Sequence, residues 1–115
     1  MVTNRLRLGG ALGVAVVAAG VGFWPRGDAE PIAPRRHEVE IRSFVYEPER
    51  LEVQRGDTVV WLNRDIVAHT ATTDGWTTGE IRTDSADWIV VEEPGEYEYT
   101  CILHPTMKGL LVVAP

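Results

Sequence analysis

The residues best suited to chemistry lie close together near the C-terminus of this 115-residue chain. Cys101, His104 and Met107 follow one another at three-residue steps in the stretch Cys-Ile-Leu-His-Pro-Thr-Met. A thiol, an imidazole and a thioether on one short segment are three metal donors. We therefore predict that this segment forms a metal-binding loop.

The softness of these donors favours copper. Thiolate and thioether sulfur suit copper(I), imidazole accepts both oxidation states, and a copper electron-transfer site combines two histidines and one cysteine with a weak axial methionine. His69 is the obvious candidate for the missing histidine, and the predicted donor set is therefore His69, Cys101, His104 and Met107. Structural zinc is the alternative, because zinc accepts cysteine and histidine but gains little from methionine. His37 is expected to be an ordinary surface or hydrogen-bonded histidine.

The N-terminal segment has the pattern of an export signal. Arg5 and Arg7 precede an uncharged run from Leu8 to Trp24, and the first acidic residue is Asp28. The run is slightly short for a transmembrane helix of about 20 residues, so a cleaved signal peptide and a retained membrane anchor both stay open. In either case the folded part is expected outside the cytoplasm. The predicted boundaries are signal or anchor 1–29, linker 30–36 and one folded domain 37–115.

Charge and cysteine usage narrow the function further. The formal net charge is −6 at pH 7, which argues against nucleic acid as a partner and suits a cationic one. Cys101 is the single cysteine of the chain, so no intramolecular disulfide can form. An unpaired thiol in an oxidising compartment is a liability unless something holds it, and a bound metal would also stabilise the fold.

Short alternating segments predict an all-β fold. Apolar and polar residues alternate through several short runs, and turn-forming residues separate these runs. One such run places Tyr97, Tyr99 and Cys101 on one face, so the cysteine should point inward. We expect a break, interpreted as a bulge, at Ser43. About seven strands at this spacing, without a helical period, indicate an antiparallel β-sandwich.

The exported part of the chain resembles the cupredoxin family of small blue copper proteins, and within it the amicyanin-like and pseudoazurin-like members. The resemblance covers nearly the whole predicted domain. It rests on Glu47, Pro48, Leu51, Val53, Gly56, Asp57, Thr58, Val59, Trp61, Asn63, Asp65, His69, Pro94, Gly95, Glu96, Tyr97, Cys101, His104, Pro105, Met107 and Gly109. The two-residue spacers on both sides of His104, with Pro105 after it, are similar to the amicyanin loop in particular.

This resemblance implies a Greek-key sandwich with the copper site at one end. It also implies that His69, Cys101 and His104 are equatorial ligands and that Met107 is axial. Thr70 departs from the family pattern, because many members have asparagine directly after the first histidine ligand, where it ties the two ligand loops together. We expect the Thr70 hydroxyl to make part of that network and its backbone N–H to face the cysteine sulfur.

The predicted function is one-electron transfer between redox proteins outside the cytoplasm, without catalysis by the chain itself. A copper carrier or storage protein that delivers the ion to another protein is the alternative. Redox partners are expected to dock near His104 on an apolar surface formed by Ile102, Leu103, Pro105, Val67 and Ala68. The resemblance suggests a dehydrogenase as donor and a cytochrome as acceptor.

Overall fold

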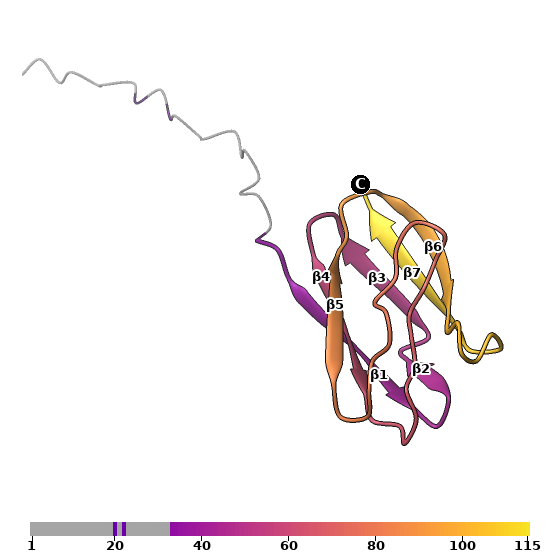
Figure 1. Cartoon of the computed structure of the whole chain (residues 1–115). Coiled ribbons are helices and arrows are strands. Elements are labelled where there is room, and N and C mark those ends of the chain that lie inside the picture. The colour runs from indigo at the N-terminus through magenta and orange to yellow at the C-terminus, as the bar shows by residue number, and fades with distance from the viewer. Residues whose placement is uncertain (1–19, 21, 23–32) are drawn as a thin grey trace, which may run out of the picture. The chain divides into compact units, whose positions relative to one another are not determined.

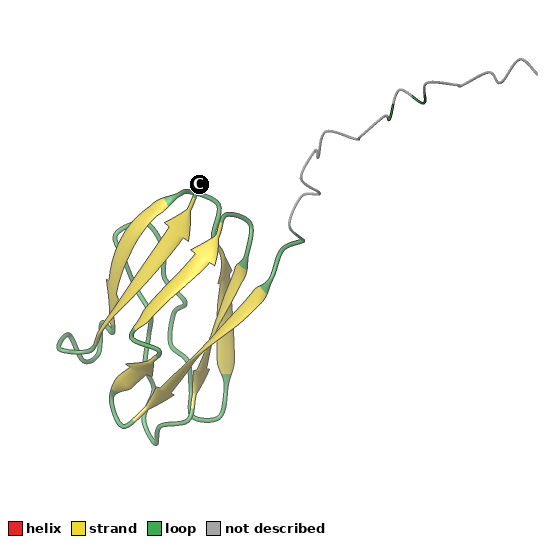
Figure 2. Ribbon diagram, turned by 180° about the vertical axis from the view of Figure 1, so that it is seen from behind, coloured by secondary structure: helices red, strands yellow, loops and turns green. Residues whose placement is uncertain are grey.

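A computed structural model describes Gly20, Gly22 and residues 33–115 of the chain, and residues 33–115 form one compact unit. This unit is built from strands, turns and loops, and no helix occurs among the described residues (Figure 2). The strands are β1 (Arg36–Arg42), β2 (Val45–Glu47), β3 (Arg50–Gln54), β4 (Thr58–Asn63), β5 (Ala86–Val90), β6 (Gly95–Thr100) and β7 (Lys108–Ala114). The all-β fold predicted from the alternating segments is confirmed.

The strands form the two layers of a sandwich (Figure 1). One sheet has the order β2-β1-β4-β5 and the other the order β3-β7-β6. Each sheet contains one parallel pair, β1 with β4 and β3 with β7, so both sheets are mixed rather than purely antiparallel as the sequence suggested. Alternation within a strand specifies which side chains face inward, but it carries no information about the direction of a distant partner strand.

Large side chains from both sheets fill the space between the layers. Trp61 of β4, Tyr46 of β2 and Tyr99 of β6 are almost completely buried, and the Tyr99 ring contacts the rings of the other two. Gly109 of β7 lies opposite Tyr99, and a Cβ atom at Gly109 would come within 2.2 Å of the tyrosine ring. The close approach explains why this strand needs a glycine at that position.

The break predicted at Ser43 is a tight turn and not a bulge. Arg42 pairs with Val45 in the antiparallel β1–β2 pair, so Ser43 and Phe44 are the two central residues of the turn. Both have positive φ, 52° and 61°, as the two-residue turns that join twisted strands require. The turn brings Phe44 to the end of the sandwich where the predicted metal loop lies.

Two connections position the predicted donors. The β6–β7 connection begins at Cys101, directly after β6, and ends at Met107, directly before β7. His69 belongs to the long β4–β5 connection, where isolated bridges pair His69 with Ile81 and Thr72 with Thr100. The second bridge fastens this connection to the end of β6, beside Cys101.

The predictions for the N-terminal segment concern residues outside the described ones. The signal or anchor 1–29 and most of the linker 30–36 therefore remain predictions. Within the described part of the chain, no helix has the length and apolar character needed to cross a bilayer.

Candidate metal centre

Three of the four predicted donors meet at one end of the sandwich. The Cys101 Sγ atom lies 3.8 Å from His69 Nδ1 and 3.7 Å from His104 Nδ1. The three donor atoms lie within 4.8 Å of one another. Cys101 and His69 are fully buried and His104 is partly buried. Two imidazoles from separate connections thus present the same nitrogen to one thiol, as a shared metal ion would require.

Backbone hydrogen bonds close the loop that carries Cys101, His104 and Met107. The Cys101 N–H donates to the Met107 carbonyl at 3.3 Å, the His104 N–H to the Cys101 carbonyl at 3.2 Å, and the Met107 N–H to the His104 carbonyl at 2.9 Å. Met107 is 3 % exposed and belongs to the same buried cluster as Cys101. The loop therefore turns the residue that carries the predicted fourth donor inward.

Asp65 fixes the orientation of the His69 ring. Its Oδ2 atom lies 2.8 Å from His69 Nε2, the nitrogen that faces away from Cys101. Burial alone would raise the pKa of Asp65, but hydrogen bonds from the Phe44 N–H, the His69 ring and the Ile66 N–H lower it below its usual value. The ionised carboxylate therefore accepts a hydrogen bond from Nε2–H, which leaves the lone pair of Nδ1 on the side of the thiol.

Thr70 connects the β4–β5 and β6–β7 connections by hydrogen bonds, as predicted for this threonine at the position where many family members have asparagine. Its backbone N–H donates to Cys101 Sγ at 3.3 Å, and its Oγ1 atom accepts a hydrogen bond from the Ile102 N–H at 2.9 Å. The Tyr46 hydroxyl donates to the Thr70 carbonyl. Burial, together with the neighbouring charge of Cys101, raises the pKa of Tyr46 far above its usual value, so this phenol remains a donor. The Thr70 N–H directed at the Cys101 sulfur would in turn stabilise a thiolate there.

Two residues that the sequence analysis gave no role belong to the site. Asp65 was noted only as part of the family resemblance, and Phe44 was not singled out. The Phe44 ring lies against both His69 and His104. An Asp four residues before a candidate ligand is a usable sequence signal for a histidine partner, whereas nothing local marks Phe44.

The predicted docking residues differ in their exposure. Ile102 is 60 % exposed and Leu103 is 45 % exposed, whereas Val67 and Ala68 are partly covered. Pro105 is exposed. Ile66, which the sequence analysis did not include, is 87 % exposed. An apolar rim on a solvent-facing loop is typical of an interaction surface.

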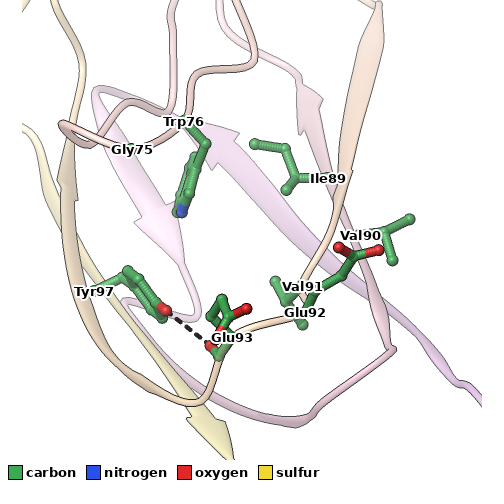
Figure 3. A pocket seen from close by; sticks show the side chains of 8 residues that line it. All are labelled: Gly75, Trp76, Ile89, Val90, Val91, Glu92, Glu93 and Tyr97. Carbon is green, nitrogen blue, oxygen red and sulfur yellow. Dashed lines mark hydrogen bonds between the residues drawn. The ribbon is translucent and has the colours of Figure 1, made fainter.

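A surface pocket elsewhere on the domain does not contain the donors. It has a volume of about 240 Å³ and is lined by Gly75, Trp76, Ile89, Val90, Val91, Glu92, Glu93 and Tyr97 (Figure 3). The Tyr97 hydroxyl donates to the Glu93 carbonyl at 2.7 Å across its rim. Trp76 packs against Trp61 and Tyr99, so it belongs to the aromatic core. The pocket offers no group of metal donors, and the candidate site is the cluster at the loop end.

Comparison with known families agrees with this geometry. The family model described as a cupredoxin-like domain matches residues 15–113. The chain belongs to the cupredoxin-like family. Among curated cupredoxins, it is 34 % identical to amicyanin of Paracoccus denitrificans over 82 residues. This alignment covers 65 % of this chain and 63 % of that amicyanin. Amicyanin of Paracoccus versutus is 29 % identical over 82 residues, covering 65 % and 62 %. The chain thus spans less than two thirds of the length of these relatives.

Solved cupredoxin structures are similar in fold. The reduced Cu(I) form of an amicyanin variant at pH 4 superposes with a TM-score of 0.65 at 31 % identity, covering 69 % of this chain and 82 % of that chain. A copper-containing nitrite reductase from Thermus scotoductus gives a TM-score of 0.64 at 25 % identity, covering 70 % of this chain and 22 % of that chain. The same sandwich therefore occurs both in small copper proteins and as part of a larger enzyme.

Proposed function

We propose that this protein is a one-electron carrier in which His69, Cys101, His104 and Met107 would hold a mononuclear type 1 copper ion. The observation that carries the proposal is the pair of imidazole Nδ1 atoms at 3.7 and 3.8 Å from one buried thiol. A bound copper ion would supply reversible exchange of one electron. The family membership and the similarity to amicyanins support the same function.

The donor set fits copper better than zinc. Two imidazoles and one thiolate, with a buried methionine closing the loop, are the set in which a weak axial thioether tunes a copper electron-transfer site. A structural zinc ion would need a fourth strong donor. Among the described residues, the only group of three or more His, Cys, Asp or Glu donors is His69, Cys101 and His104. The thioether of Met107 is therefore the candidate for the fourth position.

The protein's own contribution is to hold the donors still in both oxidation states. Asp65 fixes the His69 ring, and the Thr70 N–H points at the thiol sulfur. The bridge between Thr72 and Thr100 joins the two connections beside Cys101. Since any ligand movement on oxidation would add to the barrier for electron transfer, such prearranged contacts favour fast exchange.

His104 is the proposed route for the electron. It is the partly exposed member of the donor group, and exposed Ile102, Leu103 and Pro105 flank it. Partly covered Val67 and Ala68 extend this apolar surface. A redox protein can approach an imidazole edge closely over such a surface because few polar groups must lose their hydration, and small transient interfaces are typical of redox partners. The net charge of −6 favours a cationic partner.

The remaining parts of the proposal concern location, domain limits and the absence of catalysis. We place the folded domain 37–115 outside the cytoplasm, in the periplasm or an equivalent compartment, behind a cleaved signal or a retained anchor within 1–29. We propose no catalysis by the chain itself, because four protein donors would leave no open position for a substrate. A dehydrogenase as donor and a cytochrome as acceptor remain part of the same proposal.

The decisive experiment is the visible spectrum of the purified full chain after addition of copper(II). Strong thiolate-to-copper absorption with reversible one-electron cycling is the expected result. A colourless copper complex would contradict the type 1 site, and tight binding of zinc alone would favour a structural metal. Rapid transfer of copper to an acceptor protein, in place of redox cycling with the ion retained, would favour the copper carrier or storage alternative.

A further inference from the structure

Phe44 occupies a position that its residue type disfavours. It is the second central residue of the two-residue turn between β1 and β2, and its φ is 61°. Turns of this kind prefer glycine there, because a bulky side chain at positive φ crowds its own backbone. The ring is also 46 % exposed, so burial in the core does not explain it. A strained residue of this kind points to a role for its side chain.

The ring of Phe44 lies against both histidines of the donor group. Its centroid is 5.2 Å from that of His69 and 4.9 Å from that of His104, with interplanar angles of 85° and 87°. Nearly perpendicular contacts at these distances are the favourable arrangement for aromatic rings. The two histidines come from different connections, and Phe44 adds a third segment, the β1–β2 turn. One side chain thus contacts both imidazoles.

Asp65 fastens this turn to the site. The Phe44 N–H donates to Asp65 Oδ2 at 2.9 Å, and the same oxygen lies 2.8 Å from His69 Nε2. The backbone of Phe44 is therefore placed relative to the His69 ring by one carboxylate oxygen. Movement of the turn would disturb His69 through this contact as well as through the Phe44 ring.

His104 depends on ring contacts more than His69 does. His69 is fully buried and has a carboxylate on its outer nitrogen. For the His104 ring, the hydrogen-bonding and aromatic contacts among the described residues are those with the Cys101 sulfur and with the rings of Phe44 and His69, each with its centroid 4.9 Å away. Packing against Phe44 is thus positioned to limit rotation of the His104 imidazole.

We propose that Phe44 is a positioning residue whose ring holds the imidazoles of His69 and His104 in the orientation that presents both Nδ1 atoms to Cys101. This inference deepens the proposed function, since the consequence for copper rests on it. The orientation itself is a property of the protein alone. Contact of the Phe44 ring with both imidazoles offers a reason for a bulky residue at this positive φ.

The test compares Phe44→Gly with Val45→Ala. Glycine relieves the strain of positive φ, so the turn is retained while the ring is lost. Val45 is the next residue and is equally exposed at 46 %, which makes it a matched control. Phe44→Leu removes the aromatic ring but keeps an apolar side chain, and Phe44→Tyr restores the ring.

Two measurements are made on each variant. The first is the pattern of NOE contacts from the ring protons of His69, His104 and His37 in NMR spectra of the copper-free full chain at one fixed pH, because these contacts report ring orientation and do not depend on the ring current of Phe44. Phe44→Gly and Phe44→Leu should change the contacts that His69 and His104 make with residues other than position 44 but not those of His37, whereas Val45→Ala should leave all three patterns in place. The second is copper(II) affinity, measured by competition with a chelator. Phe44→Gly and Phe44→Leu should each bind copper about 10-fold more weakly, which is the low end of the loss usual when a residue that supports a metal ligand is removed. Phe44→Tyr should retain the wild-type affinity.

The outcomes separate the possibilities. Wild-type histidine NOE patterns or wild-type copper affinity in both Phe44→Gly and Phe44→Leu would overturn the proposal and leave Phe44 as a surface aromatic. If the wild-type chain bound no copper while the histidine NOE patterns still changed in these variants, the positioning role would stand and the proposed function would fail. If Phe44→Gly did not fold, the same two readings on Phe44→Leu would decide.

Discussion

Two histidine–carboxylate pairs in this domain are nearly identical as pairs and differ in their surroundings. His69 Nε2 lies 2.8 Å from Asp65 Oδ2, and His37 Nε2 lies 2.7 Å from Asp57 Oδ2. In both, a carboxylate also accepts backbone N–H groups. Only in the first pair does the other imidazole nitrogen face a thiol, at 3.8 Å. Histidine–carboxylate contact alone therefore does not mark a functional site.

The second pair has a structural role. Asp57 is buried and accepts hydrogen bonds from the N–H groups of Arg35 and Gln54 as well as from the His37 ring. It thereby fastens the entry of β1 to the turn between β3 and β4. The sequence analysis expected His37 to be a surface or hydrogen-bonded residue, and the structure shows that it is partly buried and hydrogen bonded.

The largest effect is expected from removal of the Cys101 thiol, the group that distinguishes the surroundings of the two pairs. Cys101→Ser should abolish the visible absorption of the copper-loaded chain, because a hydroxyl does not supply the thiolate-to-copper transition. The measurement is the visible spectrum under identical loading. Survival of the colour would show that another set of donors holds the metal, and His37→Gln serves as a control that should keep it.

The second prediction exchanges the same group in both pairs. Asp65→Asn should weaken copper binding by about 10–100-fold, as is usual when the partner of a metal-binding histidine is lost. Asp57→Asn should leave copper affinity unchanged. Chelator competition on the two variants measures the difference. Equal losses would mean that Asp65 acts on the site only through general stability.

The third prediction concerns the free energy of unfolding, which should depend on the Asp57 pair although copper affinity does not. Asp57→Asn should lower the free energy of unfolding of the copper-free chain by about 1.5–3 kcal/mol, the value of a hydrogen bond to a charged group. Denaturant unfolding of both proteins at neutral pH provides the measurement. A variant as stable as the wild type would show that the amide replaces the carboxylate fully.

The pH dependence follows from the same residue. Burial alone would raise the pKa of Asp57, but the hydrogen bonds from Arg35, Gln54 and His37 lower it below its usual value. The ionised form therefore stabilises the fold above the unfolded pKa of about 3.9, and this stability is lost as the pH falls through the lower folded value. Unfolding curves of Asp57→Asn should thus depend less steeply on pH in this acidic range, although Asp65 retains its own contribution. Identical slopes in both proteins would contradict the assignment.

The smallest effect should come from His37→Gln. This change removes the ring that contacts Asp57, but the two backbone donors remain, so a loss of about 1 kcal/mol is expected for one hydrogen bond. The reduction potential should be the same as in the wild type. A shift of the potential would mean that the two ends of the domain are coupled.

Local features of the chain determined much of the fold and of the candidate site. Period-two alternation placed Tyr97, Tyr99 and Cys101 on one face, and in the structure Tyr99 and Cys101 are buried while Tyr97 is half-buried. The order and chemical type of His69, Cys101, His104 and Met107 pointed to one centre, and three of their donor atoms do lie together. These features were predictable because side-chain direction and donor chemistry depend on residues close in sequence.

Tertiary structure alone decided how separate segments meet. Three features join residues distant in the sequence: the parallel pairing of β1 with β4, the contact of the Thr70 N–H with the Cys101 thiol thirty-one positions away, and the ring contacts of Phe44 with both histidines. Such contacts result from packing of the whole sandwich, because a strand's own pattern does not name its neighbour. The sequence determined which residues offer metal-donor atoms, and the fold decided which other residues contact them.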